Sequence, residues 1–186
     1  MSHFPDRVAT HTRLGNDYRD WIHTAQTLFA GSTILARERE RARANLRGPG
    51  KAPIDLLTLW TELMLAAFGI ECLIKATWVK QGHELARDGK YVPMCQNEGH
   101  QIVPLCQVAG ITLDVREADV LERLSIIART IGRYPIPKRA HETRPRQFYR
   151  QRGSPLSWSS DDDHVVENFV RRIKIDLRKR IATPTA

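Results

Sequence analysis

The segment from Asp55 to Lys80 has the pattern of one helix with apolar side chains on nearly every face. Such a helix is stable in water only when other elements cover it on all sides, so it predicts a central position in a helical bundle. Three ionisable side chains, Glu62, Glu71 and Lys75, interrupt the stretch, and a bilayer span would have to bury all of them. We therefore expect a core helix and no membrane partner.

Other segments show apolar side chains at the three- and four-residue spacing that is typical of amphipathic helices. They span about 16–47, 100–109, 114–131 and 160–180. Thr112 or Asp114 can cap the third segment, and Ser160 precedes three aspartates that suit the start of the last. No alternating strand pattern is present, and residues 82–99 are expected to form an irregular insertion. The chain is thus predicted to be a single all-α domain, residues 1–186, an antiparallel bundle of four long helices plus a short one.

The charge and the cysteines limit the classes of partner and ligand. Lys and Arg total 29 against 21 Asp and Glu, a formal charge of +8, which makes nucleic acid the leading charged partner. The N-terminus lacks the apolar core of a signal peptide, and three cysteines form no disulfide framework, so we expect a cytoplasmic protein with reduced thiols. Cys95, His100 and Cys106, with His83 nearby, lack the close cysteine pairs of structural zinc sites. We expect no metal and no cofactor.

Basic side chains concentrate in a loop expected over residues 138–160. Its candidate nucleic-acid-binding residues are Lys138, Arg139, Arg144, Arg146, Arg150 and Arg152. Phe148, Tyr149 and Trp158 lie close in sequence and can stack on bases. The alternative for this loop is a solvated, flexible surface. A second basic group, Arg37 to Arg43, alternates with Glu38 and Glu40, and a solvated helix face is at least as good an interpretation of it.

Three segments, in this order along the chain, resemble the HEPN superfamily of helical domains: Trp60–Ala76, Gly99–Ile102 and Gly132–Pro135. The resemblance implies a HEPN-like helical bundle that forms a homodimer. It also implies a toxin or defence ribonuclease in a bacterial setting, or the partner of a cognate antitoxin or of another protein.

The ribonuclease members of that superfamily carry an Arg followed, after four to six residues, by a His near a helix end. Arg133 and His141 are the candidate catalytic pair, and the seven residues between them are one more than the family pattern has. The activity implied is that of a metal-independent endoribonuclease, in which an imidazole transfers the proton and a guanidinium stabilises negative charge on phosphorus. The alternative is that Arg133 only anchors the end of its helix and that the protein is a catalytically inactive interaction module forming homodimers or protein complexes.

Glu71 is the third candidate site residue, because a carboxylate midway along an apolar helix must be paired. One interpretation is an ion pair with Lys75, one turn further on, along an exposed strip of the helix. A second is a bridge in the core to Arg133. A third is an acid that orients the catalytic Arg133 or His141.

Overall fold

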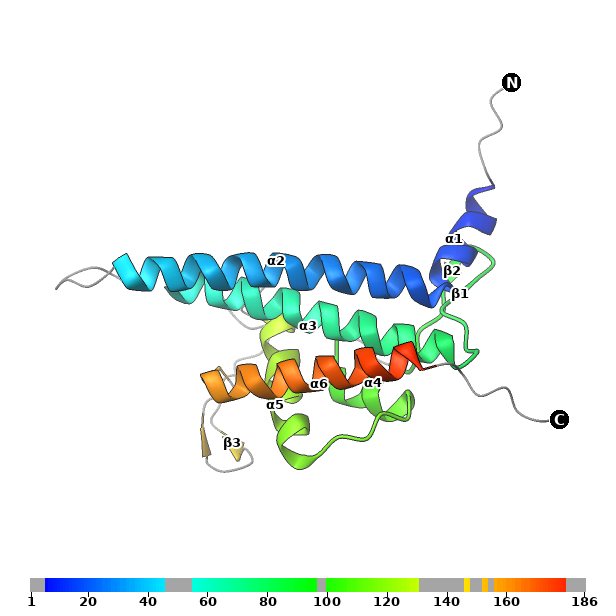
Figure 1. The fold of residues 1–186 in the computed structure, drawn as a ribbon. Helices are drawn as coiled ribbons and strands as arrows, with labels where there is room; N and C mark the ends of the chain where they lie inside the picture. The colour runs from blue at the N-terminus through cyan, green and yellow to red at the C-terminus, as the bar shows by residue number, and fades with distance from the viewer. Residues whose placement is uncertain are drawn as a thin grey trace, which may run out of the picture.

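The computed structural model describes residues 6–45, 55–96, 100–130, 146–147, 152–153 and 156–179. This part of the chain is mainly helical, as expected (Figure 1). Helix α3 (Asp55–Lys80) lies between α2 (Tyr18–Asn45) and α6 (Ser160–Arg178), and it also packs against α4 (Ile102–Val108) and α5 (Val115–Arg129). The bounds of α3 are those expected from the sequence.

Helix α3 occupies the centre because its side chains are apolar in nearly every direction. Ile70, Leu73 and Ile74 are fully buried, and they join the core with Leu121 and Leu124 of α5. Each large aliphatic side chain buried in this way contributes about 1.5–3 kcal/mol relative to an exposed one. The helix runs antiparallel to α2 and in the same direction as α6 (Figure 1).

The N-terminal part of the chain differs from the expectation of one helix from about residue 16. A separate helix, α1 (Arg7–Gly15), precedes α2, and the Asp6 side chain accepts a hydrogen bond of 2.9 Å from the backbone N–H of Val8 to cap it. Helix α1 has no buried residue, so it adds no side chain to the core.

The segment expected as an irregular insertion packs onto the core through part of its length. It contains a short hairpin, β1 (Ala86–Arg87) paired antiparallel with β2 (Lys90–Tyr91), and Leu85, Ala86 and Met94 are buried. The Asn16 side chain holds the hairpin: its Nδ2 donates to the Ala86 carbonyl at 2.7 Å, and its Oδ1 accepts from the N–H groups of Leu85 and Ala86. Within the segment expected to be irregular, these residues thus form an ordered hairpin and contribute to the core.

Helices α5 and α6 begin with capping boxes. Asp114 caps α5, accepting from the Glu117 N–H at 2.8 Å while the Glu117 carboxylate accepts from the Asp114 N–H. In α6 the capping residue is Ser159, one residue before the expected Ser160, and Asp162 completes the box. Among the described residues, none of the helices has the length and apolarity that crossing a membrane requires.

Candidate functional site

A buried carboxylate on α3 binds two basic side chains. Glu71 is only 7% exposed, and its Oε1 accepts from the Lys75 ammonium at 2.7 Å. Its other oxygen, Oε2, lies 2.8 Å from Nδ1 of His100, which is 29 residues further along the chain. Both carboxylate oxygens are therefore engaged, one within the helix and one across to the loop before α4.

The Glu71 carboxyl is held in its charged form. Burial opposes ionisation more than any other single influence, but the His100 hydrogen bond and the Lys75 ammonium together lower the pKa of Glu71 below its ordinary value. A carboxylate only accepts hydrogen bonds, so we infer that Nδ1 of His100 carries the proton between them. In the neutral imidazole, Nε2 then bears the lone pair and is the proton acceptor.

The position of His100 leaves its imidazole partly exposed to solvent. The side chain is 36% exposed, and Nε2 has no hydrogen-bond partner within the described residues. The opposite side of the ring is supported by Phe68, whose ring centroid lies 4.9 Å away. The arrangement has the features of a general acid–base group: a half-buried imidazole oriented by an ionised acid.

The backbone at His100 is strained. Its φ of 60° is left-handed, a conformation that costs about 1–2 kcal/mol for a residue with a side chain. Two residues later, the Ile102 N–H donates to Ser125 Oγ of α5 at 3.0 Å, and the Ser125 hydroxyl donates in turn to the Leu121 carbonyl. These bonds hold the loop against α5, and strain of this kind persists where the surroundings enforce a particular side-chain position.

No family model, curated protein or solved structure matches this chain.

Of the candidate catalytic residues, Glu71 lies within the described part of the chain. Arg133 and His141 lie outside it, as do Lys138, Arg139, Arg144 and Arg150. Arg146 is in β3 (Arg146–Gln147) and Arg152 is in β4 (Arg152–Gly153), and these strands pair antiparallel with Gln147 opposite Arg152. The backbone thus brings two of the basic positions together in one short hairpin.

The geometry corrects two interpretations made from the sequence. Glu71 does pair with Lys75, but Lys75 is 8% exposed, so the pair is buried and does not lie on an exposed strip. His100, expected at the start of the helix over 100–109, lies before α4 and is the second partner of Glu71, and Gln101 is the residue that precedes α4. The described residues hold no group of three His, Cys, Asp or Glu side chains arranged to bind a metal ion.

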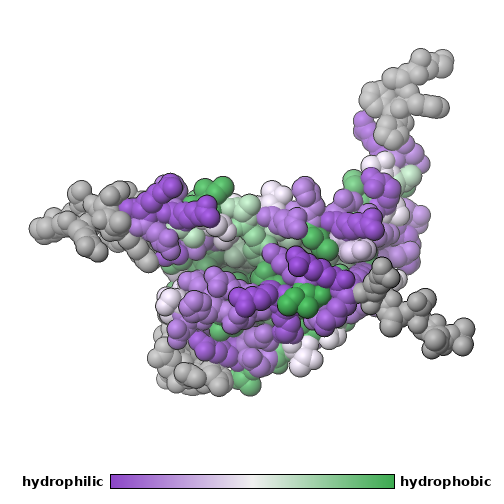
Figure 2. Space-filling view, in the orientation of Figure 1, coloured by the Kyte–Doolittle hydropathy of each residue, from purple (hydrophilic) through white to green (hydrophobic). Residues whose placement is uncertain are grey.

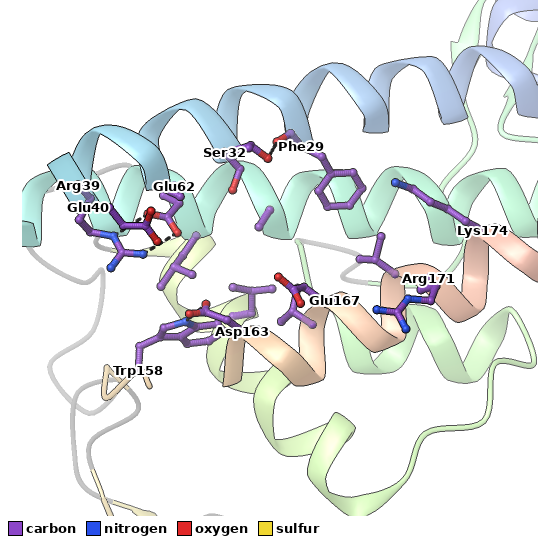
Figure 3. Close-up of a pocket in the computed structure, with 17 residues that line it drawn as sticks. Phe29, Ser32, Arg39, Glu40, Glu62, Trp158, Asp163, Glu167, Arg171 and Lys174 are labelled. Atoms are coloured by element: carbon purple, nitrogen blue, oxygen red, sulfur yellow. Dashed lines mark hydrogen bonds and ion pairs between the residues drawn. The ribbon is translucent and has the colours of Figure 1, made fainter. Parts of the chain in front are cut away.

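A second feature is a groove of about 590 Å³ between α2 and α6, with α3 and Leu124 of α5 at its floor. Apolar side chains show through the hollow, framed by hydrophilic ones (Figure 2). Trp158 closes one end, and Phe29 and Lys174 lie towards the other (Figure 3). The aromatic, apolar and charged lining is typical of a surface that binds another molecule.

Buried ion pairs fix the walls of this groove. Arg39 binds Glu62 of α3 through two hydrogen bonds of 2.9 and 3.1 Å, so this member of the Arg37 to Arg43 group does not belong to a solvated face. Arg123 of α5 binds both oxygens of Asp162, at 2.6 and 3.0 Å, with its guanidinium over the Trp158 ring. Neither pair was expected from the sequence, because each joins residues more than twenty positions apart.

Proposed function

We propose that this protein is a HEPN-like helical-bundle protein that binds RNA and cleaves it without a metal ion, with His100 as a general acid–base group. The observation that carries this proposal is the Glu71–His100 pair, in which an ionised acid orients an imidazole whose side chain is 36% exposed. Glu71 acts through His100 and is therefore a positioning residue, and Lys75 keeps Glu71 ionised.

The reaction requires one proton acceptor, one proton donor and stabilisation of phosphate charge. Nε2 of His100 takes the proton of a ribose 2′-hydroxyl, whose oxygen attacks the adjacent phosphorus. The bond from phosphorus to the 5′-oxygen breaks, a proton passes to that oxygen, and the products are a 2′,3′-cyclic phosphate and a 5′-hydroxyl. No electrons are exchanged, so no redox partner is needed.

The resemblance makes Arg133 and His141 a catalytic pair, and with His100 as the base we assign them the remaining roles. Arg133 stabilises the extra negative charge on phosphorus, and His141 protonates the leaving oxygen. Thr130, the C-cap residue of α5, is three residues before Arg133, a chain length that spans at most about 10–11 Å. Its helix is the one that holds the His100 loop through Ser125. The short connection supports a common site for Arg133 and His100.

The charge of +8 and the basic hairpin of β3 and β4 support RNA as the substrate. A homodimer, a cognate antitoxin and a bacterial toxin or defence role complete the proposal on the strength of the resemblance alone.

The groove between α2 and α6 favours one other function, that of a catalytically inactive interaction module. Its apolar floor and charged rim suit a protein partner, and binding there requires neither Glu71 nor His100. This alternative predicts intact RNA under all conditions and an unchanged complex when His100 is replaced.

Incubation of the full chain with labelled single-stranded RNA in EDTA tests the proposal. We expect cleavage to a 2′,3′-cyclic phosphate, a loss of at least about 100-fold in His100→Ala, and full activity in the matched control His164→Ala, which changes an exposed histidine of α6. Loss in Arg133→Ala and His141→Ala tests the roles that we assign to them. Full activity in His100→Ala with loss in His141→Ala would contradict the role of His100. Salt-dependent binding without cleavage would leave a binding module.

A further inference from the structure

A second pocket, of about 430 Å³, lies where α1, the start of α2 and the β1–β2 hairpin meet. Its walls include Trp21 and Tyr91, which are aromatic, and Leu85 and Ala86, which are buried. Asp20 contributes a carboxylate to the same lining. Flat aromatic walls beside one acidic group are suited to a planar ligand with hydrogen-bond donors on its edge.

The walls are held in place by contacts that do not involve a ligand. The Trp21 indole N–H donates to the Gly15 carbonyl at 2.8 Å, which fixes the orientation of the ring. Asn16 ties the same turn to the hairpin through Leu85 and Ala86. At Gly15 the chain approaches so closely that an added Cβ would lie 2.5 Å from the Ala86 Cβ. The pocket is thus formed in the free chain.

One oxygen of Asp20 has no partner. Its Oδ2 is buried and accepts no hydrogen bond within the described residues. An acid in the first turn of α2 stabilises the helix through its dipole, but that role does not require a buried, unsatisfied oxygen. A buried acceptor without a donor is destabilising, and a ligand that supplies the donor removes this penalty.

Lys75 links this pocket to the Glu71–His100 pair. Its ammonium binds Glu71 at 2.7 Å and lies 5.3 Å from the Trp21 ring centroid and 5.1 Å from that of Tyr91. Lys75 therefore contacts both the aromatic walls of the pocket and the Glu71–His100 pair. This arrangement suits an RNA site in which the pocket takes a base and the pair lies at the neighbouring phosphate.

We propose that this pocket binds a guanine base of the RNA substrate, against the aromatic side chains of Trp21 and Tyr91 and with its edge on Asp20. This inference rests on the proposed function, since it names the base that lies beside the reacting phosphodiester. Guanine presents two adjacent donors, N1–H and the N2 amino group, to a carboxylate. Adenine and cytosine place an acceptor next to their amino group, and uracil flanks its one donor with two carbonyls, so each repels a carboxylate.

Isothermal titration of the full chain with nucleoside 5′-monophosphates tests the inference without requiring cleavage. We expect guanosine monophosphate to bind at least tenfold more tightly than the uridine, cytidine and adenosine monophosphates. Inosine monophosphate, which lacks the N2 amino group, should bind more weakly than guanosine monophosphate. Equal affinities for the four common nucleotides would overturn the assignment.

Two variants and a control localise the site. Asp20→Asn should weaken guanosine monophosphate binding at least tenfold and remove the preference, while Tyr91→Leu, at a side chain that is 45% exposed, should weaken all the nucleotides. Asp161→Asn makes the same charge change at the start of α6 and should have no effect. Unchanged binding in Asp20→Asn would contradict the pocket. If the chain cleaves RNA through His100 but does not prefer guanosine monophosphate, only the guanine assignment is contradicted. If it prefers guanosine monophosphate but does not cleave RNA, only the proposed cleavage is contradicted.

Discussion

Replacing Glu71 with Gln should destabilise the protein through Lys75. The amide keeps the volume of the carboxyl and leaves an acceptor for His100, but it removes the charge that balances an ammonium only 8% exposed. Breaking a buried ion pair by removing one partner costs about 3 kcal/mol or more. For a chain of this length, that loss lowers the melting temperature by roughly 6–12 °C.

The destabilisation should depend on pH with a definite sign. The folded-state pKa of Glu71 lies below its ordinary value of 4.5, because the His100 hydrogen bond and the Lys75 charge outweigh the opposing effect of burial. The stabilisation by Glu71 is therefore fully present above about pH 4.5 and is lost as the pH falls through the folded-state pKa. The difference between wild type and Glu71→Gln should persist from pH 7 to about pH 5 and shrink below that.

Urea unfolding followed by circular dichroism, repeated from pH 7 to pH 3, measures this difference. Glu84→Gln is the control, since it makes the same substitution in an exposed pair with Arg87 at the same distance of 2.7 Å and should leave the stability unchanged. A difference for Glu71→Gln below about 1 kcal/mol at pH 7, the range of exposed pairs, would refute the reasoning. A difference in unfolding free energy that is as large at pH 3 as at pH 7 would also refute the reasoning.

Three further predictions follow from other contacts. Asp162→Asn should lower the unfolding free energy by about 3–5 kcal/mol in urea unfolding, because it leaves the buried Arg123 guanidinium without its main partner; stability equal to wild type would contradict a buried pair. Asn16→Ala removes three hydrogen bonds to the hairpin segment and should lower the unfolding free energy by about 2–3 kcal/mol. Amide hydrogen exchange at Leu85 and Ala86 should become faster, and unchanged exchange would show that Asn16 does not hold the hairpin. Burial raises the pKa of Cys72 to about 11 and that of Cys106 to about 12, so Cys95 should react first with a thiol reagent at pH 8; equal rates would be the contrary result.

The sequence predicted those parts of the fold in which local pattern and packing agree. The central position of helix α3 was predictable because a helix that is apolar on all sides is stable only inside a bundle. The start of α5 was predictable because Asp114 is a good capping residue, and with Glu117 it forms a capping box. Helix α1 was missed because it is short and contributes no buried residue to the core, and the β1–β2 hairpin was missed because two-residue strands are too short to show alternation.

The candidate site could be predicted only in part, for a similar reason. Glu71 was identifiable because a charge in an apolar helix needs a partner, and Lys75 was within reach one turn later. The contact with His100 was not, because it joins positions 29 residues apart and depends on how the loop is held to α5 by Ser125. The unpartnered oxygen of Asp20 likewise follows from the arrangement of α1, α2 and the hairpin, which sequence spacing does not encode.

The most direct test of the central claim is the rate at which labelled single-stranded RNA is cleaved in EDTA. The rate is measured for the wild type, His100→Ala and Glu71→Gln, and folding is verified for each chain at the assay temperature. We predict that the wild type cleaves, that His100→Ala loses at least about 100-fold in rate, and that Glu71→Gln loses less, because the imidazole remains but is no longer oriented by a charge. Undiminished cleavage by a folded His100→Ala chain would contradict the account.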